Sequence, residues 1–487
     1  MKRDAMLLLA GRAAQAVLTI AAFRLLTAFL SPAEAGGIYL IISVATFFGM
    51  FALNPVFMYL GRKLFVWHDS KSIFEHLLGY NIYSIIVSLS VIPVVLGLWK
   101  FFGVGAGLPG LVFALIVACY TYTLNWNQVF IPFLNTLGHK SSFVLLTLVT
   151  SGLGLSFSVA AVHFSSPSAV SWMSGQIAGI GLSAVLGFYV FRQKVPEPQS
   201  AAWRSPGYAN RAIFFNVAGF AGPLAGAAFF MWAQAQSYRV VVEKISGPEF
   251  LGYLAVGFSI ATSVAGILES LVQQLYLPVF YRQISGADKD ARSAALSELA
   301  AKTIPAYLIY LFFLVGTSEY LASFLVAEKY RGVFVYARYG AFIEFFRMTA
   351  NILASAAHSE MRTGVLIKPY LFGGISAVAG VYLAALSPEP SVFIPLALAA
   401  SGLVTVSVMW YSMNSMVPLH LRFKPLLRYP LLSALFLPLV FVHARGFLPS
   451  LCLLFISGAY FSFLQYKAAG KWLGGLKFSS GAERGAL

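Results

Sequence analysis

Apolar segments of membrane-spanning length follow one another along almost the whole chain, and few charged residues interrupt them. A helix needs roughly 20 apolar residues to cross a bilayer, and the chain divides into about fourteen such segments, with twelve as the alternative count. The predicted spans are Met6–Phe29, Ala33–Leu60, Phe74–Trp99, Pro109–Thr136, Ser142–Val162, Ala169–Phe191, Ile213–Val242, Phe250–Tyr281, Thr303–Ala327, Val333–Ala357, Gly364–Leu386, Val392–Asn414, Leu431–His443 and Phe447–Tyr466. The thirteenth is short and could pair with the fourteenth as a re-entrant hairpin. The sequence therefore predicts an all-α integral membrane protein.

Composition supports lipid as the solvent of this chain. Hydrophobic residues make up 59% of it and charged residues only 10%, which is more apolar surface than one soluble core buries. The opening Met-Lys-Arg-Asp runs into a long apolar stretch without a small-residue cleavage site, so we expect the first span to be retained. Cys119 and Cys452 both lie in apolar runs, which argues against a disulfide framework.

The net charge of +16 follows the predicted topology. Positive residues are retained on the cytoplasmic side of a membrane, and most of the 33 Lys and Arg residues fall in segments on one side. Both termini are therefore predicted to be cytoplasmic, and the charge gives no reason to expect nucleic acid as a partner. No loop is long enough for a soluble catalytic domain, so we expect no enzymatic activity. Residues 282–302 predict a short helix at the inner surface.

A short motif occurs twice, each time where the first span of a half meets the second. The first copy contains Arg24, Ser31, Glu34 and Gly37, and the second has the same residue types 215 positions later, at Arg239, Ser246, Glu249 and Gly252. We interpret this as an internal duplication. Because an even number of spans separates the copies, the two halves would have the same orientation and enclose a cavity.

The duplication gives the predicted domain organisation. We expect two six-helix lobes, a Pro-rich linker between them, a further pair of helices and a tail. The boundaries are 1–191 for the N-lobe, 192–212 for the cytoplasmic linker, 213–414 for the C-lobe, 431–466 for helices thirteen and fourteen, and 467–487 for the cytoplasmic tail.

The Ser and Glu of the motif are typical of a helix start. In Ser-x-x-Glu before an apolar run, the serine hydroxyl accepts a free backbone N–H of the first turn and the glutamate reaches back to the cap. Pro32 and Pro248 suit the same position, where the missing N–H costs nothing. We therefore assign these residues to capping rather than to chemistry.

Arginines inside the predicted spans are candidates for function, because an arginine at the bilayer centre costs at least about 2.5 to 3.5 kcal/mol. The candidates for binding a diphosphate or an anionic sugar are Arg24, Arg239, Arg12 and Arg347. The structural alternatives are snorkelling to an interface, or local ion pairs at the spacings Arg239–Glu243 and Glu344–Arg347. The repetition of Arg24 and Arg239 favours a functional role, with both converging on the groove between the lobes.

Other polar residues in the spans could line the same cavity. The candidate neutral residues are Gln15, Asn125, Asn127, Gln128 and Gln273, and the candidates for ion coupling are Glu269 and Glu344. Amides suit sugar hydroxyls, but they could equally hydrogen-bond neighbouring helices. Neither a metal nor a cofactor is predicted: the seven histidines form no ligand-spaced pair, and the glycines of residues 103–110 follow no strand.

The segment LSPAEAGGIYLIISVATFFG, its second copy ISGPEFLGYLAVGFSIATSVAG and the following LYLPVFYRQ resemble the Wzx-type polysaccharide flippases of the multidrug/oligosaccharidyl-lipid/polysaccharide (MOP) exporter superfamily. The resemblance covers nearly the whole chain in topology. Relatives often carry an acidic residue just before the position of Arg239, where this chain has Tyr238.

The resemblance implies export of an undecaprenyl-diphosphate-linked oligosaccharide across the bacterial inner membrane by alternating access. Helices thirteen and fourteen would shape a groove for the lipid tail. The expected partners are the lipid-linked oligosaccharide, membrane lipids, and the polysaccharide polymerase and chain-length machinery, and we expect the protein to be a monomer.

Two rivals stay open at this point. A cation-coupled multidrug exporter of the same superfamily would need buried carboxylates, whereas spans one to six are biased towards cations. A membrane polymerase or ligase acting on the same lipid-linked sugar would need catalytic groups and a sizeable outer loop. The identity of the sugar, the driving ion and the oligomeric state are not specified by these patterns.

Overall fold

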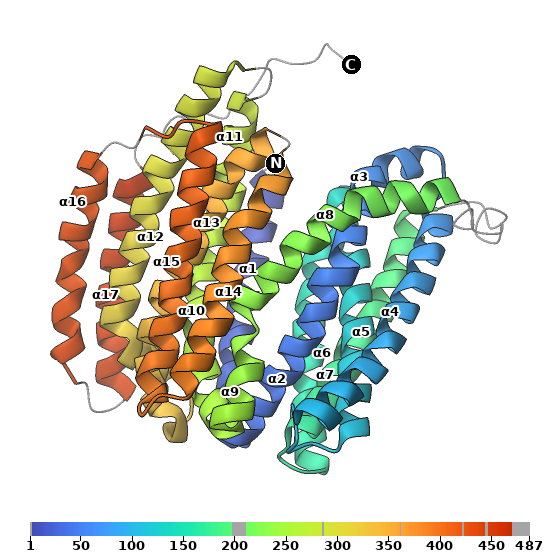
Figure 1. The fold of residues 1–487 in the computed structure, drawn as a ribbon, viewed down its shortest axis with the longest axis horizontal. Helices are drawn as coiled ribbons and strands as arrows, with labels where there is room; N and C mark the ends of the chain where they lie inside the picture. The colour runs from blue at the N-terminus through green and yellow to red at the C-terminus, as the bar shows by residue number, and fades with distance from the viewer. Residues whose placement is uncertain are drawn as a thin grey trace. The chain divides into compact units, whose positions relative to one another are not determined.

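The computed structural model describes residues 2–196, 211–284, 287–360, 362–420, 423–443 and 447–469. Within these ranges every regular element is helical, which confirms the predicted fold class (Figure 1). The α-helices are α1 Lys2–Phe29, α2 Pro32–Phe48, α3 Asn54–Asp69, α4 Ile73–Phe102, α5 Gly110–Thr136, α6 Lys140–Phe164, α7 Ala169–Lys194, α8 Arg211–Ala235, α9 Tyr238–Ser246, α10 Pro248–Leu275, α11 Leu277–Ile284, α12 Lys289–Leu325, α13 Phe334–Ser359, α14 Ile367–Ala385, α15 Pro390–Met416, α16 Phe423–Ser433 and α17 Phe447–Ala469. Shorter helical segments are η1 Gly49–Leu53, η3 Glu328–Val333, η4 Thr363–Leu366 and η5 Ala434–Phe441.

Eleven stretches of helix in the described chain are long and apolar enough to cross a membrane. Helices α5 and α13 correspond to the predicted fourth and tenth spans, and the shorter apolar helix Arg428–Phe441 corresponds to the thirteenth. Helices α2, η1 and α3 form one continuous stretch, Pro32–Asp69, in which η1 is a π-helical turn. The chain is therefore a multi-pass membrane protein.

The described helices separate into two compact units. The first contains residues 1–256, 325–330 and 366–401, and the second contains residues 257–324, 331–365 and 402–487. In the first unit α4 packs on α5, α5 on α6 and α6 on α7 (Figure 1). Helix α7 also contacts α5, and α8 packs on α14. In the second unit Phe436 of η5 packs against Phe313 of α12, next to Leu464 of α17.

These units do not follow the predicted lobe boundaries, because α8, α9 and α14 group with the N-terminal helices. Most of the predicted linker 192–212 and of the tail 467–487 lies outside the described residues. The division of the chain into two six-helix lobes at these boundaries therefore stays a prediction.

The prediction of a separate short helix at 282–302 is wrong. Helix α12 starts at Lys289 and continues for 37 residues to Leu325, so this segment is the first part of a spanning helix. Its residues from Ala291 to Ala301 are mostly alanine, leucine, serine and glutamate, without glycine or proline, and nothing in them ends a helix.

The two copies of the repeated motif contact each other inside the first unit. A Cβ atom built on Gly36 would lie 1.9 Å from the Pro248 carbonyl oxygen, and one on Gly252 would lie 1.8 Å from the Pro32 carbonyl oxygen. The contact is therefore reciprocal, and it pairs residues that are 216 positions apart, Pro32 with Pro248 and Gly36 with Gly252. Only glycine allows the two helix starts to approach so closely.

The change of register has a local cause. In the first copy Ser31 is the N-cap of α2, and its hydroxyl accepts the Glu34 N–H at 3.3 Å, as predicted. In the second copy Gly247, with φ +88°, stands between Ser246 and Pro248, so α10 starts one residue later. The Ser246 hydroxyl is buried and has no hydrogen-bond partner among the described residues. At α2 the serine half of the predicted capping box is thus confirmed, but the Glu34 carboxylate accepts the Ala169 N–H of α7 instead of reaching back to the cap. At α10 the predicted serine cap is wrong.

Candidate functional site

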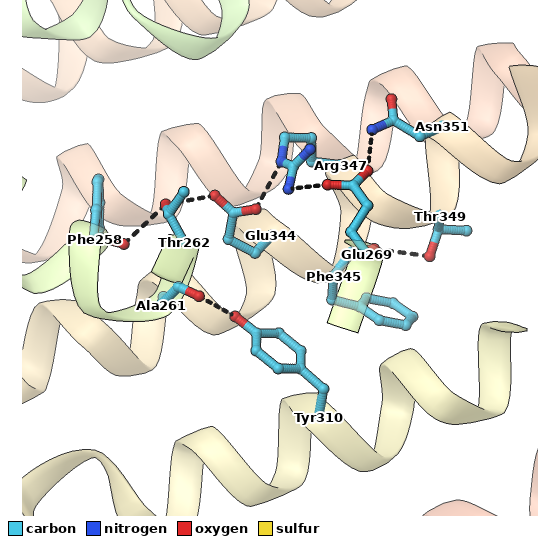
Figure 2. Close-up of polar contacts among 10 residues, drawn as sticks. All are labelled: Phe258, Ala261, Thr262, Glu269, Tyr310, Glu344, Phe345, Arg347, Thr349 and Asn351. Atoms are coloured by element: carbon cyan, nitrogen blue, oxygen red, sulfur yellow. Dashed lines mark hydrogen bonds and ion pairs between the residues drawn. The ribbon is translucent and has the colours of Figure 1, made fainter. Parts of the chain in front are cut away.

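Helix α13 carries the most densely connected polar cluster of the second unit (Figure 2). The guanidinium of Arg347 lies between two carboxylates: Nε donates to Glu344 Oε2 at 2.7 Å, and an N–H of the terminal nitrogen Nη2 donates to Glu269 Oε2 at 2.9 Å. Glu344 is one helical turn before Arg347, whereas Glu269 comes from α10. The predicted local pair of Arg347 and Glu344 is therefore confirmed, and a second carboxylate joins it across helices.

The outer oxygens of both carboxylates also have partners. The Asn351 side-chain amide donates to Glu269 Oε1 at 2.7 Å, and the Thr262 hydroxyl lies 2.7 Å from Glu344 Oε1. Thr262 precedes Glu269 by two helical turns and Asn351 follows Arg347 by one, so each lies on the same helix face as its neighbour. The sequence prediction missed Thr262 and Asn351, although this spacing could have identified both.

Hydrogen bonding distinguishes the two carboxylates. Both oxygens of Glu269 receive an N–H donor, so the group is satisfied as an anion. The Thr262 hydroxyl has a single proton, yet its oxygen lies 2.7 Å from Glu344 and 3.0 Å from the Phe258 carbonyl oxygen. The hydroxyl proton is therefore shared between the Glu344 carboxylate and the Phe258 carbonyl, whereas each oxygen of Glu269 has a donor of its own.

Burial makes this cluster costly to disturb. The exposed fraction of the side chain is 9% for Glu344 and 16% for Glu269, against 36% for Arg347. Two buried carboxylates facing one guanidinium leave one negative charge uncompensated unless one carboxylate is protonated. Removal of Arg347 would therefore leave two carboxylates without the cation that both of them contact. Tyr310 of α12 packs nearby, and its hydroxyl donates to the Ala261 carbonyl at 3.0 Å (Figure 2).

Arg24 lies in the first unit and has a different kind of partner. Its guanidinium donates to the backbone carbonyl of Val326, in the segment that directly follows α12. Three further bonds fix the same segment to the end of α1. The Ala327 N–H donates to the Thr27 hydroxyl at 3.0 Å, Lys329 Nζ to the Ala28 carbonyl at 3.1 Å and the Tyr330 hydroxyl to the Leu30 carbonyl at 3.1 Å. A carbonyl orients the guanidinium but leaves its positive charge in place.

Arg239, also in the first unit, lies among aromatic rings. Its guanidinium carbon is 5.2 Å from the centroid of the Tyr39 ring, and its Nε donates to the Tyr238 hydroxyl at 3.2 Å. Glu243, the partner that the spacing allowed, instead accepts the Gly105 N–H, with both carboxylate oxygens at 3.2 Å. In the described part of the chain, neither Arg24 nor Arg239 forms an ion pair with a carboxylate.

The remaining candidates come from three helices, α1, α5 and α10. Arg12 donates to the Gln15 side-chain carbonyl at 3.1 Å on the exposed side of α1. Gln128 of α5 and Gln273 of α10 are exposed. Their role in a substrate cavity, like that of the four arginines, stays a prediction.

The two asparagines of α5 hydrogen-bond neighbouring helices. Asn125 bridges α4, with its carbonyl 2.7 Å from the Tyr80 hydroxyl and its amide donating to Ser84 at 3.0 Å. The Tyr80 hydroxyl also lies 3.3 Å from the Leu53 carbonyl of the π-helical turn η1. Asn127 is buried and donates to Thr150 at 3.0 Å and to Ser183 at 3.3 Å. These contacts are those of the structural alternative that the sequence left open.

Potential metal ligands do not cluster in the described ranges. Within them, no group of three or more His, Cys, Asp or Glu side chains is placed to hold an ion.

Comparisons with known proteins identify the fold. No family model matches the sequence, and no curated protein sequence matches it. A structure of the lipid II flippase MurJ in an inward closed conformation matches with a TM-score of 0.67 at 13% identity, over 97% of this chain and 100% of the flippase. An inward-facing multidrug resistance MATE family transporter of the MOP superfamily matches with a TM-score of 0.60 at 12% identity, over 82% of this chain and 95% of the transporter. An outward-facing MATE transporter matches with a TM-score of 0.53 at 12% identity, over 85% and 95% of the two chains. The chain thus has the fold of these membrane transporters.

Proposed function

We propose that this protein is a flippase that moves an undecaprenyl-diphosphate-linked oligosaccharide from the cytoplasmic to the outer leaflet of a bacterial inner membrane by alternating access. The observation that carries the proposal is the state of Arg24 and Arg239, two intramembrane cations whose described partners are all neutral. A guanidinium offers five N–H donors in a fixed fork, which suits the oxygens of a diphosphate. A cation already neutralised by carboxylates would serve this purpose less well.

The fold comparison supports the same choice. The flippase structure matches over its whole length and nearly the whole of this chain, whereas the two MATE transporters leave 15% to 18% of this chain unmatched. The matched flippase MurJ moves lipid II, as its name states. We carry a lipid class of substrate over to this chain, and not the identity of that lipid.

The cluster of Glu269, Arg347 and Glu344 favours a second candidate, a cation-coupled multidrug exporter. Buried carboxylates attract cationic drugs and coupling ions. Here, however, Arg347 contacts both carboxylates, whereas the described partners of Arg24 and Arg239 are neutral. We therefore assign the cluster to energy coupling or to structure, and the arginines to the substrate.

Deletion of the gene separates the candidates. Loss of a flippase should leave lipid-linked repeat units on the inner leaflet, where an externally added glycosidase cannot reach them. Loss of a polymerase would leave the same units exposed outside, and loss of a drug exporter would leave none and make the cells drug-sensitive. Either of these two outcomes would overturn the proposal. Complementation with Arg24→Ala plus Arg239→Ala should fail, and a matched Arg338→Ala variant should restore export, because Arg338 pairs with Ser318 at 3.0 Å in the second unit.

A further inference from the structure

A cavity of about 300 Å³ opens among four helices of the first unit, α1, α2, α6 and α7. Its wall is mostly hydrocarbon, with Ala22 and Phe23 from α1, Ile38 from α2, Leu155 from α6 and Met173 from α7. Ile38 and Met173 are almost fully buried at its base, with exposed fractions of 2% and 1%. The cavity is thus a preformed apolar site of a size that small ligands use.

The cavity has a cause in the sequence. Helices α6 and α7 approach through glycines: a Cβ atom on Gly175 would lie 2.2 Å from the Phe157 carbonyl oxygen, and one on Gly179 would lie 2.5 Å from that of Leu153. Helix α1 faces this tight pair, and only 6% of the most apolar window of its span is buried inside the protein. The tight pair and the loosely packed helix therefore leave a gap among α1, α2, α6 and α7.

Three polar side chains along this wall already form hydrogen bonds within the protein. The Thr19 hydroxyl donates to the Gln15 backbone carbonyl at 2.9 Å, and the Ser151 hydroxyl donates to the Thr147 carbonyl at 3.2 Å. The side-chain carbonyl of Gln176 accepts the Ser158 hydroxyl at 3.4 Å. No charged residue is among those that line this cavity in the described chain. A sugar would lose more hydrogen bonds here than it could form, whereas a hydrocarbon chain would lose none.

A polar site lies on the same seam between α1 and α6. A second, small cavity is lined by Arg12, Gln15 and Thr147. Arg12 is seven residues before Thr19, which corresponds to roughly 10 Å along the helix. The apolar span of α1 starts at Ala10, so Arg12 lies at its end and the large cavity lies at its middle. An amphiphile with its head at Arg12 would place its chain in the large cavity.

We propose that this seam binds a resident anionic phospholipid, with the phosphate at Arg12 and one acyl chain in the cavity. Arg12 is exposed, and its one described hydrogen bond, to Gln15, leaves N–H donors for a phosphate. Anionic headgroups are attracted to basic residues at the ends of spans. This assigns Arg12 to a structural lipid rather than to the transported diphosphate, and it does not depend on the proposed function.

Photolabelling tests the proposal on the full-length protein. The protein is placed in phosphatidylcholine nanodiscs that contain a trace of phosphatidylglycerol with a diazirine in its acyl chain, and adducts are mapped by mass spectrometry. We expect adducts on residues 18–26 of α1 and on α2 residues that line the cavity. Ala22→Phe should reduce them at least roughly tenfold, because the ring fills the space of several methylene groups. Arg12→Gln should reduce them roughly tenfold, the loss of one charge-assisted contact.

Matched controls keep the result interpretable. Ala21→Phe adds the same ring to the neighbouring position, which does not line the cavity, and should label like the wild type. Ile42→Phe fills the cavity from α2, and it replaces Ala22→Phe as the cavity-filling variant if Ala22→Phe does not elute as a folded protein. Equal labelling of Ala22→Phe and Ala21→Phe would overturn the proposal. So would equal labelling by a diazirine phosphatidylcholine probe, or labelling by a diazirine polyprenyl phosphate in place of phosphatidylglycerol.

Discussion

Arg347 of the second unit and the motif arginines Arg24 and Arg239 of the first unit are held in opposite ways. In the second unit, Arg347 lies between Glu344 and Glu269 and its charge is used within the protein. In the first unit, Arg24 and Arg239 rest on a carbonyl, a hydroxyl and an aromatic ring, and their charges stay available. The same residue type in a predicted span therefore serves packing in one place and is free for a ligand in the other. Partners distinguish the two cases, and sequence position does not.

The largest expected loss of stability follows substitution of Arg347, the arginine that is paired with two carboxylates. Arg347→Gln would leave Glu269 and Glu344 buried near each other without a cation, which should cost about 3–5 kcal/mol of stability. Thermal unfolding in detergent, followed by gel filtration, would measure this loss. The triple variant Arg347→Gln, Glu269→Gln and Glu344→Gln removes all three charges and should recover most of it. A single Arg347→Gln variant as stable as the wild type would remove the contrast between the units.

The stability of the first unit should instead be sensitive to substitutions at the contact between its two motif copies. Gly36→Ala and Gly252→Ala each place a methyl group against a backbone carbonyl, and overpacking of this kind costs about 1–3 kcal/mol or more. Gly37→Ala is the matched control, since its Cβ would lie 3.2 Å from the Ala169 methyl group and needs only a small adjustment. Equal melting temperatures for Gly252→Ala and Gly37→Ala would contradict the reciprocal contact.

Within the cluster, the two carboxylates should respond differently to the same substitution. Glu344→Gln should be tolerated, because its amide can donate to the Thr262 hydroxyl and free that proton for the Phe258 carbonyl. Glu269→Gln should cost about 1–3 kcal/mol, because its NH₂ group would face an N–H of Arg347 or Asn351. Melting temperatures of the two variants in the same detergent give the comparison, and the reverse order would contradict this difference between the two carboxylates.

The smallest expected loss of stability follows substitution of Thr262, whose hydroxyl contacts Glu344. Thr262→Val keeps the shape of the side chain and removes one hydroxyl, so we expect a loss of about 1 kcal/mol. In the double variant with Glu344→Gln the two losses should not add, because both changes act on the same contact. Fully additive changes in unfolding free energy would argue against a direct bond.

Local features of this fold could be predicted from the sequence, and contacts between helices could not. Apolar length predicted the spans, Ser31 predicted the cap of α2, and the spacing of Glu344 and Arg347 predicted their ion pair. Each of these depends on residues within one or two turns. The contact of Glu269 with Arg347 depends on the register of α10 against α13, which no single-helix pattern contains.

The error at the second motif copy has a local origin instead. Matching residue types gave an offset of 215, but Gly247 adds one residue before α10 and changes the pairing to 216. Ser246 therefore lies too early to cap the helix. A positive φ at one glycine was enough to separate the sequence motif from the contact that it makes.

Binding of a polyprenyl diphosphate tests the contrast between the arginines most directly. Purified protein in nanodiscs would be titrated with the ligand by isothermal calorimetry, using variants that elute as folded protein. We expect Arg24→Ala plus Arg239→Ala to weaken binding roughly 100-fold, since two charge-assisted contacts are lost, and the charge-neutral triple variant at Arg347, Glu269 and Glu344 to bind like the wild type. Unchanged affinity in the first variant together with lost affinity in the triple variant would contradict the account.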